Sequence, residues 1–149
     1  MKKITIFSAA LLTLIGANAS AQSGVTANQV TGNSVSIQIQ NVHARTGQIM
    51  LSLCTAAEYD AGDRCAFGKI VPIRNIARPI VIENVPNGTY GVKLFHDVNG
   101  NGRMDTNAMG IPREPYGFSN NARGRFGPAK FEDASFTVDK TTSIAIRIN

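Results

Sequence analysis

Apolar residues recur at every second position in several short stretches of this chain, and this pattern restricts the fold to β-structure. In residues 34–40, Val35, Ile37 and Ile39 alternate with polar residues, and residues 143–148 repeat the pattern with three isoleucines. A strand turns successive side chains to opposite faces, so a period of two predicts strands with one apolar face. Similar runs predict strands at residues 49–53, 80–85, 90–96 and 136–138, and a short one at 69–73. A turn of helix is expected only around residues 56–60.

The number and spacing of these strands predict an all-β fold. Six or seven short strands within about 115 residues are typical of two antiparallel sheets packed face to face. The chain contains no Trp, so it lacks the residue that marks antibody-type domains. The hairpin at residues 85–90, which turns at Pro86, Asn87 and Gly88, resembles one found in transthyretin-like modules. We therefore expect a single antiparallel β-sandwich of about seven strands, transthyretin/prealbumin-like, over residues 34–149, with one long ordered loop.

The first residues have the features of an export signal. Lys2 and Lys3 precede an apolar stretch at residues 4–15, and small residues at 17–21 form a cleavage region. The apolar stretch is too short to cross a bilayer, which takes about 20 residues. We predict a signal peptide at residues 1–21, cleaved after Ala21 or alternatively after Ala19, and a flexible lead-in at residues 22–33. The expected location is the periplasm or the exterior of the cell.

The charge of the chain does not favour nucleic acid as a partner. The formal net charge is +5, and removal of the predicted signal with its two lysines would lower it to +3 (5 − 2 = 3). A charge of this size is too modest for a nucleic-acid-binding domain, and export makes such a partner less accessible still.

Cys54 and Cys65 are the two cysteines of the chain, and ten residues separate them. An exported protein meets an oxidising compartment, so a disulfide between them is expected. The alternative of a metal or catalytic thiol is disfavoured, because neither cysteine has a nearby His and the CxxC spacing is absent.

Residues 97–130 form a long connection between two predicted strands. Loops of more than about 15 residues are usually functional or disordered. This one contains Ile111, Tyr116, Phe118 and Phe126, and we expect these apolar side chains to hold it across one end of the sandwich. Arg and Tyr are favoured in interfaces. We therefore regard four residues as a candidate binding surface for a glycan, a lipid head group or an envelope protein: Arg113, Tyr116, Arg123 and Arg125.

The start of this connection has the spacing of a calcium loop. Oxygen-bearing side chains stand at Asp97, Asn99, Asn101 and Asp105, and Gly102 is placed for a sharp turn. The carbonyl of Arg103 would supply one more ligand, and Glu114 would return to replace the missing twelfth-position carboxylate, where Ala108 stands. A metal-free multiple turn is the favoured alternative, because Asn and Asp cap local N–H groups and tolerate left-handed backbone. Any calcium site with so few carboxylates would be weak.

Catalytic residues are hard to identify in this sequence. The chain has two histidines, His43 and His96, and no Gly-x-Ser-x-Gly elbow or His-rich metal cluster. His96 and Asp97 lie where a strand meets the long loop, but adjacent strand residues point to opposite faces. We expect a packed or capping His96 and a non-enzymatic protein, with a small periplasmic hydrolase using His96 and Asp97 as the alternative.

One family resemblance covers most of residues 34–148. Its centre runs from Leu94-Phe95-His96-Asp97 through Gly110-Ile111-Pro112-Arg113-Glu114 to Tyr116-Gly117-Phe118-Ser119-Asn120, and the 86–90 hairpin, the 128–136 run and the cysteine pair fit as well. These strings resemble an uncharacterised bacterial family of exported proteins, the domain of unknown function 2141. The resemblance implies a small exported single-domain protein and no established activity or catalytic residues. We expect a binding or accessory module of the bacterial envelope, with a weak calcium-stabilised loop as its sharper form.

Overall fold

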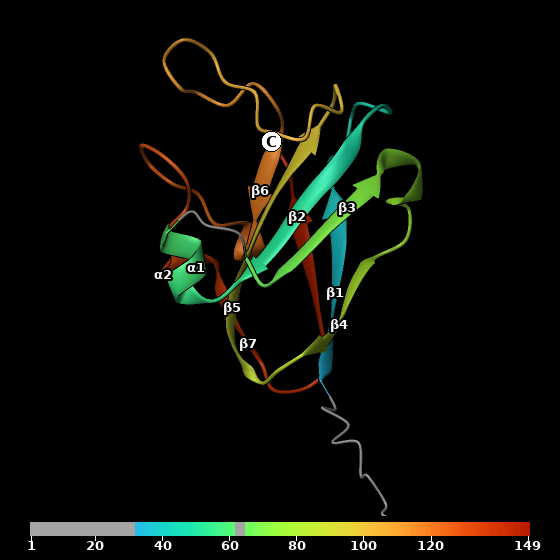
Figure 1. The fold of residues 1–149 in the computed structure, drawn as a ribbon, viewed down its shortest axis with the longest axis vertical. Coiled ribbons are helices and arrows are strands. Elements are labelled where there is room, and N and C mark those ends of the chain that lie inside the picture. The colour runs from blue at the N-terminus through green and yellow to red at the C-terminus, as the bar shows by residue number, and fades with distance from the viewer. Residues whose placement is uncertain (1–31, 62–64) are drawn as a thin grey trace, which may run out of the picture.

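The computed structural model describes residues 32–61 and 65–149. The predicted signal peptide at residues 1–21 and nearly all of the predicted lead-in at 22–33 lie outside these residues. The described residues form eight strands in two sheets (Figure 1). In chain order the strands are β1 (Asn33–Gln40), β2 (Gln48–Cys54), β3 (Phe67–Pro72), β4 (Ile80–Val85), β5 (Gly88–Asp97), β6 (Tyr116–Phe118), β7 (Ser135–Val138) and β8 (Thr142–Arg147). The helical segments are α1 (Ala56–Ala61), α2 (Phe131–Ala134) and the 3-10 turns at Ile73–Asn75 and Ser119–Asn121.

The two sheets share one apolar core. A three-stranded sheet has the order β4-β1-β8, and a five-stranded sheet has the order β3-β2-β5-β6, with β7 also paired to β5. Ile37 of β1, Leu53 of β2, Val92 of β5 and Ile146 of β8 are all fully buried in the same cluster. The predicted alternation therefore sets the inner face of β1, β2, β5 and β8, and the prediction of an all-β fold is confirmed. Within the described residues, no helix is long and apolar enough to span a membrane.

Three details differ from the sequence-based prediction. β1 pairs with β8 in parallel, so the structure is not purely antiparallel as predicted. A strand with alternating apolar residues has the same sequence pattern in parallel and in antiparallel pairing, so periodicity alone does not distinguish the two directions. The short strand β6 divides the predicted 34-residue loop, and it was missed because three residues are too few to show a period. The single turn of α2 was missed for the same reason, whereas α1 confirms the predicted helical turn.

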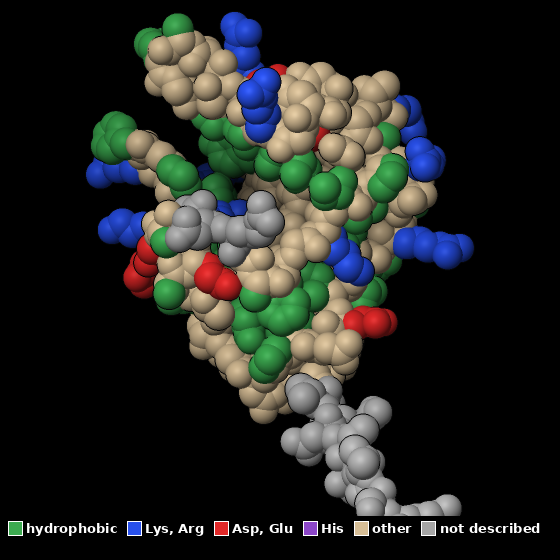
Figure 2. Space-filling model, viewed as in Figure 1, with side chains coloured by type: hydrophobic (Ala, Val, Ile, Leu, Met, Phe, Trp, Pro, Cys, Tyr) green, Lys and Arg blue, Asp and Glu red, His purple; other side chains and the backbone are tan. Residues whose placement is uncertain are grey.

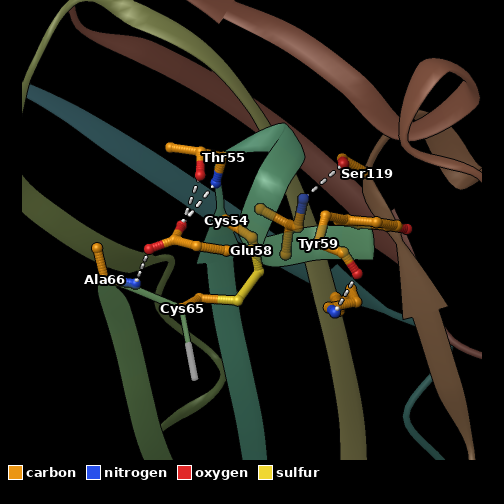
Figure 3. The surroundings of a disulfide bond; sticks show 9 residues. Cys54, Thr55, Glu58, Tyr59, Cys65, Ala66 and Ser119 are labelled. Carbon is orange, nitrogen blue, oxygen red and sulfur yellow. Dashed lines mark hydrogen bonds between the residues drawn. A yellow bond between two sulfur atoms is a disulfide. The ribbon is translucent and has the colours of Figure 1, made fainter. Parts of the chain in front are cut away.

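A second, smaller core lies at one end of the five-stranded sheet, on the outer face. Cys54 and Cys65 are joined by a disulfide, as predicted (Figure 3). The two cysteines pack with Tyr59, Phe118 and Phe131. The Tyr59 ring meets Phe131 edge-on, with ring centroids 5.5 Å apart.

Gly91 allows α1 to approach the sheet closely. A Cβ atom at this position would lie 3.0 Å from the Tyr59 ring. The Glu58 carboxylate joins both ends of the disulfide loop, because it accepts the N–H groups of Thr55 at 2.8 Å and Ala66 at 2.9 Å (Figure 3). The hydrogen bond from the Thr55 backbone is the largest cause that lowers the pKa of Glu58. Together α1 and the disulfide cover one end of the outer face.

Candidate functional site

The loop that begins at Asp97 is folded around this carboxylate. The side chain of Asp97 is fully buried. One of its oxygens accepts the backbone N–H groups of Gly100 at 2.8 Å and Asn101 at 3.0 Å, and the other accepts the N–H of Gly102 and the Gln48 amide, at 2.8 and 2.9 Å. Burial alone would raise the pKa of Asp97, but these four hydrogen bonds together lower it. The positive φ angles of Gly100 and Gly102 allow the chain to turn this tightly.

Glu114 closes the same loop from its far end. Its side chain is 7% exposed, and its two oxygens accept the N–H groups of Val98 at 2.9 Å and Asp105 at 3.1 Å. The calcium interpretation needs Glu114 to return to this loop, and its carboxylate does contact the loop backbone, where it accepts N–H groups. Asp105 in turn accepts hydrogen bonds from the Asn99 and Asn101 amides, at 2.6 and 2.9 Å. The backbone N–H of Arg103 donates to the Asn101 side chain at 2.9 Å.

The six residues predicted as calcium ligands therefore belong to one hydrogen-bonded network. In the part of the chain that the structure describes, no three His, Cys, Asp or Glu side chains come close enough together to hold a metal ion. The amide oxygens of Asn99 and Asn101 already accept backbone N–H groups two residues ahead, at 3.0 and 2.9 Å. A loop of this kind is stable as a multiple turn without a metal. Calcium binding here stays a prediction from the sequence.

His96 and Asp97 point to different partners. The Nε2 atom of His96 lies 2.7 Å from the Thr46 carbonyl, whereas Asp97 faces Gln48 and the loop. Both side chains are fully buried, as expected for a packed His96. Nε2 is the donor in this bond, because a carbonyl only accepts, and Nδ1 has no hydrogen-bond partner among the described residues. The arrangement gives neither residue access to a substrate.

The outer face of the five-stranded sheet carries an unusual row of apolar side chains. Met50 of β2 pairs with Ile70 of β3 and with Phe95 of β5, and Phe95 pairs with Tyr116 of β6. We call Ile70, Met50, Phe95 and Tyr116 the apolar row. Their chain neighbours Leu51 and Leu94 are buried on the inner face, so the apolar row points outward. Ile70 is 60% exposed, and the other three are half-buried.

A second row of outward-facing residues lies beside the apolar row, and its small side chains leave a depression in the surface of the sheet. Ser52 pairs with Gly68 and with Lys93, and Lys93 pairs with Phe118. Gly68 and Ser52 are small, so they leave space above the sheet. The Lys93 ammonium donates a hydrogen bond of 3.1 Å to the Tyr59 carbonyl and lies 4.6 Å from the centre of the Tyr59 ring. Burial lowers the pKa of Lys93, and the Asp60 carboxylate partly offsets this effect.

Two loops flank these rows and form a groove of 1210 Å³. The first loop (residues 98–115) contributes Met104, Met109 and Ile111, and the second loop (residues 122–130) contributes Arg125 and Phe126. Figure 2, drawn from the same side as Figure 1, shows the hollow between these loops with hydrophobic side chains gathered in it. Ligand sites are usually concave, largely apolar and 300–1,000 Å³ in volume. The groove is larger than this range, and it shares the concave shape and the largely apolar lining of such a site.

The two loops are held by polar contacts at their bases, not by apolar side chains at their tips. The interpretation of Phe126 and Ile111 as residues that fix the loop is wrong, because they are 98% and 53% exposed. Phe118 does have this role, at 7% exposed. Carboxylates close the base of the first loop. Asn120 and Asn121 fix the base of the second loop, and both have φ angles in the left-handed region that Asn tolerates.

The predicted binding-surface residues lie in different places. Tyr116 and Arg125 line the groove. Arg123 lines a smaller cavity of 290 Å³ beside β6, and its guanidinium donates to the Asn149 side chain at 2.8 Å. Arg113 is exposed on the first loop, where its backbone N–H donates to the Asp105 carbonyl. The structure therefore brings Tyr116 and Arg125 to one site, and Arg113 and Arg123 lie outside the groove lining.

Sequence reasoning missed the floor of the groove. Met50 and Phe95 occupy the positions that should be polar in a strand with one exposed face. The signal was present, because each of the runs Ile49-Met50-Leu51 and Val92-Lys93-Leu94-Phe95 places an apolar residue out of phase with the period of two. Such a residue indicates either burial on both faces or an exposed binding face.

A comparison with protein families gives one match. The sequence profile described as "uncharacterized protein conserved in bacteria (DUF2141)" matches residues 37–145. This range includes the cysteine pair, the first loop, the second loop and all four residues of the apolar row. Neither the curated proteins nor the solved structures contain a match to the chain.

Proposed function

The chain belongs to the bacterial family DUF2141, whose description names no activity, and we propose that it is a non-enzymatic binding module of the bacterial cell envelope. The ligand is an elongated apolar molecule that lies in the groove on the outer face of the five-stranded sheet. The observation that carries this proposal is the apolar row, which crosses four neighbouring strands and faces outward.

The apolar row has a cost that a ligand would offset. Exposed faces of antiparallel sheets are normally polar, and large exposed apolar patches promote association. Four of the five large apolar side chains that are exposed in the described residues line the groove: Ile70, Met109, Ile111 and Phe126. This concentration at one place supports a binding role, since apolar residues scattered singly over a surface would not.

Two observations support a place in the envelope. The sequence begins with the features of an export signal, and the Cys54–Cys65 disulfide is of a kind that persists in oxidising compartments. We also propose that the two sheets form one sandwich of the transthyretin-like type. The support is the hairpin at residues 85–90 and the apolar cluster that both sheets share.

The alternative of a hydrolase using His96 and Asp97 has less support. Both side chains are fully buried, and each is engaged with a different partner. A general base must reach the proton that it removes, either directly or through one water. The calcium-stabilised loop remains the sharper form of the proposal from the sequence.

A neutral fluorescent dye tests the proposed function. Nile red gains fluorescence in apolar sites, so we expect saturable binding to the purified protein. Ile70→Glu should weaken binding about tenfold, because it removes an apolar side chain worth about 1.5–3 kcal/mol when buried. Val81→Glu is the matched control, since Val81 is an exposed β-branched residue of β4 in the other sheet. Absence of saturable binding, or equal effects of the two substitutions, would contradict the proposal.

A further inference from the structure

We propose that the ligand of the groove is a free long-chain fatty acid, whose carboxylate binds the Lys93 ammonium and whose acyl chain covers the apolar row. This inference rests on the proposed function and adds the chemistry of the ligand to it. Three observations carry it: the sign of the charges that line the groove, the position of Lys93 in the floor, and the lack of backbone partners on the face of a sheet.

The charges of the groove select for an anion. Among the described residues that line it, the charged ones are Lys69, Lys93 and Arg125, and none is acidic. The Asp60 carboxylate interacts with Lys93 from outside the lining and offsets only part of the effect of its burial. The Lys69 ammonium donates to the carbonyl of Val81 in β4, which engages it away from the groove. Lys93 and Arg125 are therefore the cations available to a ligand, Lys93 in the floor and Arg125 on the exposed second loop.

Lys93 is the better placed of these two cations. Its ammonium has three N–H donors, and one of them is used by the Tyr59 carbonyl. The other two have no hydrogen-bond partner within the described part of the chain. Contact with the Tyr59 ring and partial burial fix the ammonium and remove part of its water, which strengthens its attraction to an anion. A ligand carboxylate next to the Lys93 ammonium would replace the hydrogen bonds to water that the ammonium loses when it is buried.

The rest of the groove suits an acyl chain better than a peptide. β2 is paired on both sides, to β3 and β5, and β5 is paired to β2 and to β6 or β7. The backbone groups of β2 and β5 are therefore used within the sheet, and the face above these two strands presents side chains alone. An extended peptide would bury its own N–H and C=O groups without partners, at a cost of about 1–3 kcal/mol each. An acyl chain has no such groups.

The dimensions of the groove agree with a single chain. Four neighbouring strands at about 4.8 Å spacing give the apolar row a length of roughly 14 Å. At its side, Met109 and Ile111 of the first loop provide further apolar surface. Methionine adapts its shape to irregular partners, so it suits a flexible chain. The groove thus offers a cation in its floor next to an elongated apolar surface.

Displacement of Nile red by two ligands of equal chain length tests the inference on the purified protein. Palmitate and hexadecanol differ in the head group, and both are used below the concentration at which they aggregate. We expect palmitate to displace the dye about tenfold better, because a hydrogen bond to a charged group is worth about 1.5–3 kcal/mol. Lys93→Met should remove this advantage, so that palmitate and hexadecanol displace the dye equally well. Lys93→Arg should retain most of it, and Lys140→Met is the control on a distant exposed turn.

Each outcome decides between the two proposals. If Nile red binds but palmitate and hexadecanol displace it equally from the wild-type protein, the fatty-acid inference is overturned and the apolar groove remains. If Nile red does not bind, both proposals fail. Sedimentation with anionic phospholipid vesicles gives a third arm, in which binding to vesicles without binding of free palmitate overturns the inference in favour of a membrane surface. An unchanged urea midpoint of the Lys93 variants, read from the signal of the fold and not from the dye, shows that the protein is still folded.

Discussion

Replacing Asp97, the last residue of β5, should destabilise the protein more than any substitution in the first loop. The carboxylate accepts four hydrogen bonds, three from backbone N–H groups and one from the Gln48 amide. A hydrogen bond to a charged group contributes about 1.5–3 kcal/mol. Gly100, Asn101 and Gly102 are exposed, so in Asp97→Ala water would form hydrogen bonds with their N–H groups and recover part of this free energy. Counting about 1 kcal/mol for each bond gives a loss of about 4 kcal/mol for Asp97→Ala.

Two further variants make this prediction specific. Asp97→Asn keeps one acceptor oxygen but turns an N–H group toward the N–H of Gly102, so we expect a loss of about 2 kcal/mol. Asp105→Asn is the matched control within the same loop, because Asp105 accepts its side-chain hydrogen bonds from two exposed amides. Exposed interactions of this kind are worth less than about 1 kcal/mol. The free energies of unfolding are measured by urea denaturation at neutral pH.

The pH dependence gives an independent check on Asp97. Its pKa in the folded protein is lowered from the ordinary value of 3.8. The carboxylate therefore stabilises the fold fully above that ordinary value, and the contribution is lost as the pH falls through the lowered pKa. We expect Asp97→Asn to flatten the acid side of the stability curve. A loss below 1 kcal/mol for Asp97→Ala, or the same loss for Asp97 and Asp105 variants, would refute the reasoning.

The remaining predictions concern the disulfide and the calcium loop. Replacing both Cys54 and Cys65 by Ser should lower the free energy of unfolding by about 2–3 kcal/mol, because the short loop that they close gains chain entropy when unfolded; an unchanged urea midpoint would contradict this. Calcium should bind to the 97–114 loop with a dissociation constant of about 10⁻⁴–10⁻³ M, since it has to displace the side-chain amides that already donate hydrogen bonds to Asp105. Calorimetry that gives no heat, together with equal melting temperatures in calcium and in a chelator, would contradict the calcium interpretation.

Much of the fold follows from local patterns in the sequence. The strands that alternate, such as residues 34–40, are found where the period of two placed them. The disulfide and the turn of helix after Cys54 also follow from local features. The parallel pairing of β1 with β8 does not, because it joins two segments about 100 residues apart in the chain, and tertiary packing alone determines their direction.

The site was predictable in part for a similar reason. Glu114 was expected to return to the loop of Asp97, since a carboxylate was missing at the usual distance, and it does return. The exposure of Phe126 was misjudged, because the residue type alone does not show whether an aromatic side chain in a loop is buried or exposed. The residues that hold the second loop are asparagines with left-handed φ angles. The apolar row depends on register across four strands, and the sequence of any one strand does not contain this information.

Mapping the ligand on the structure tests the central claim most directly. Amide chemical shifts of the isotope-labelled protein are recorded by NMR during a titration with Nile red. We predict that the largest shifts occur at the apolar row and at the tips of the two loops, around Met109 and Phe126, with small changes in β1 and β4. Shifts that cluster on the three-stranded sheet, or no shifts at a dye concentration that saturates fluorescence, would contradict the account.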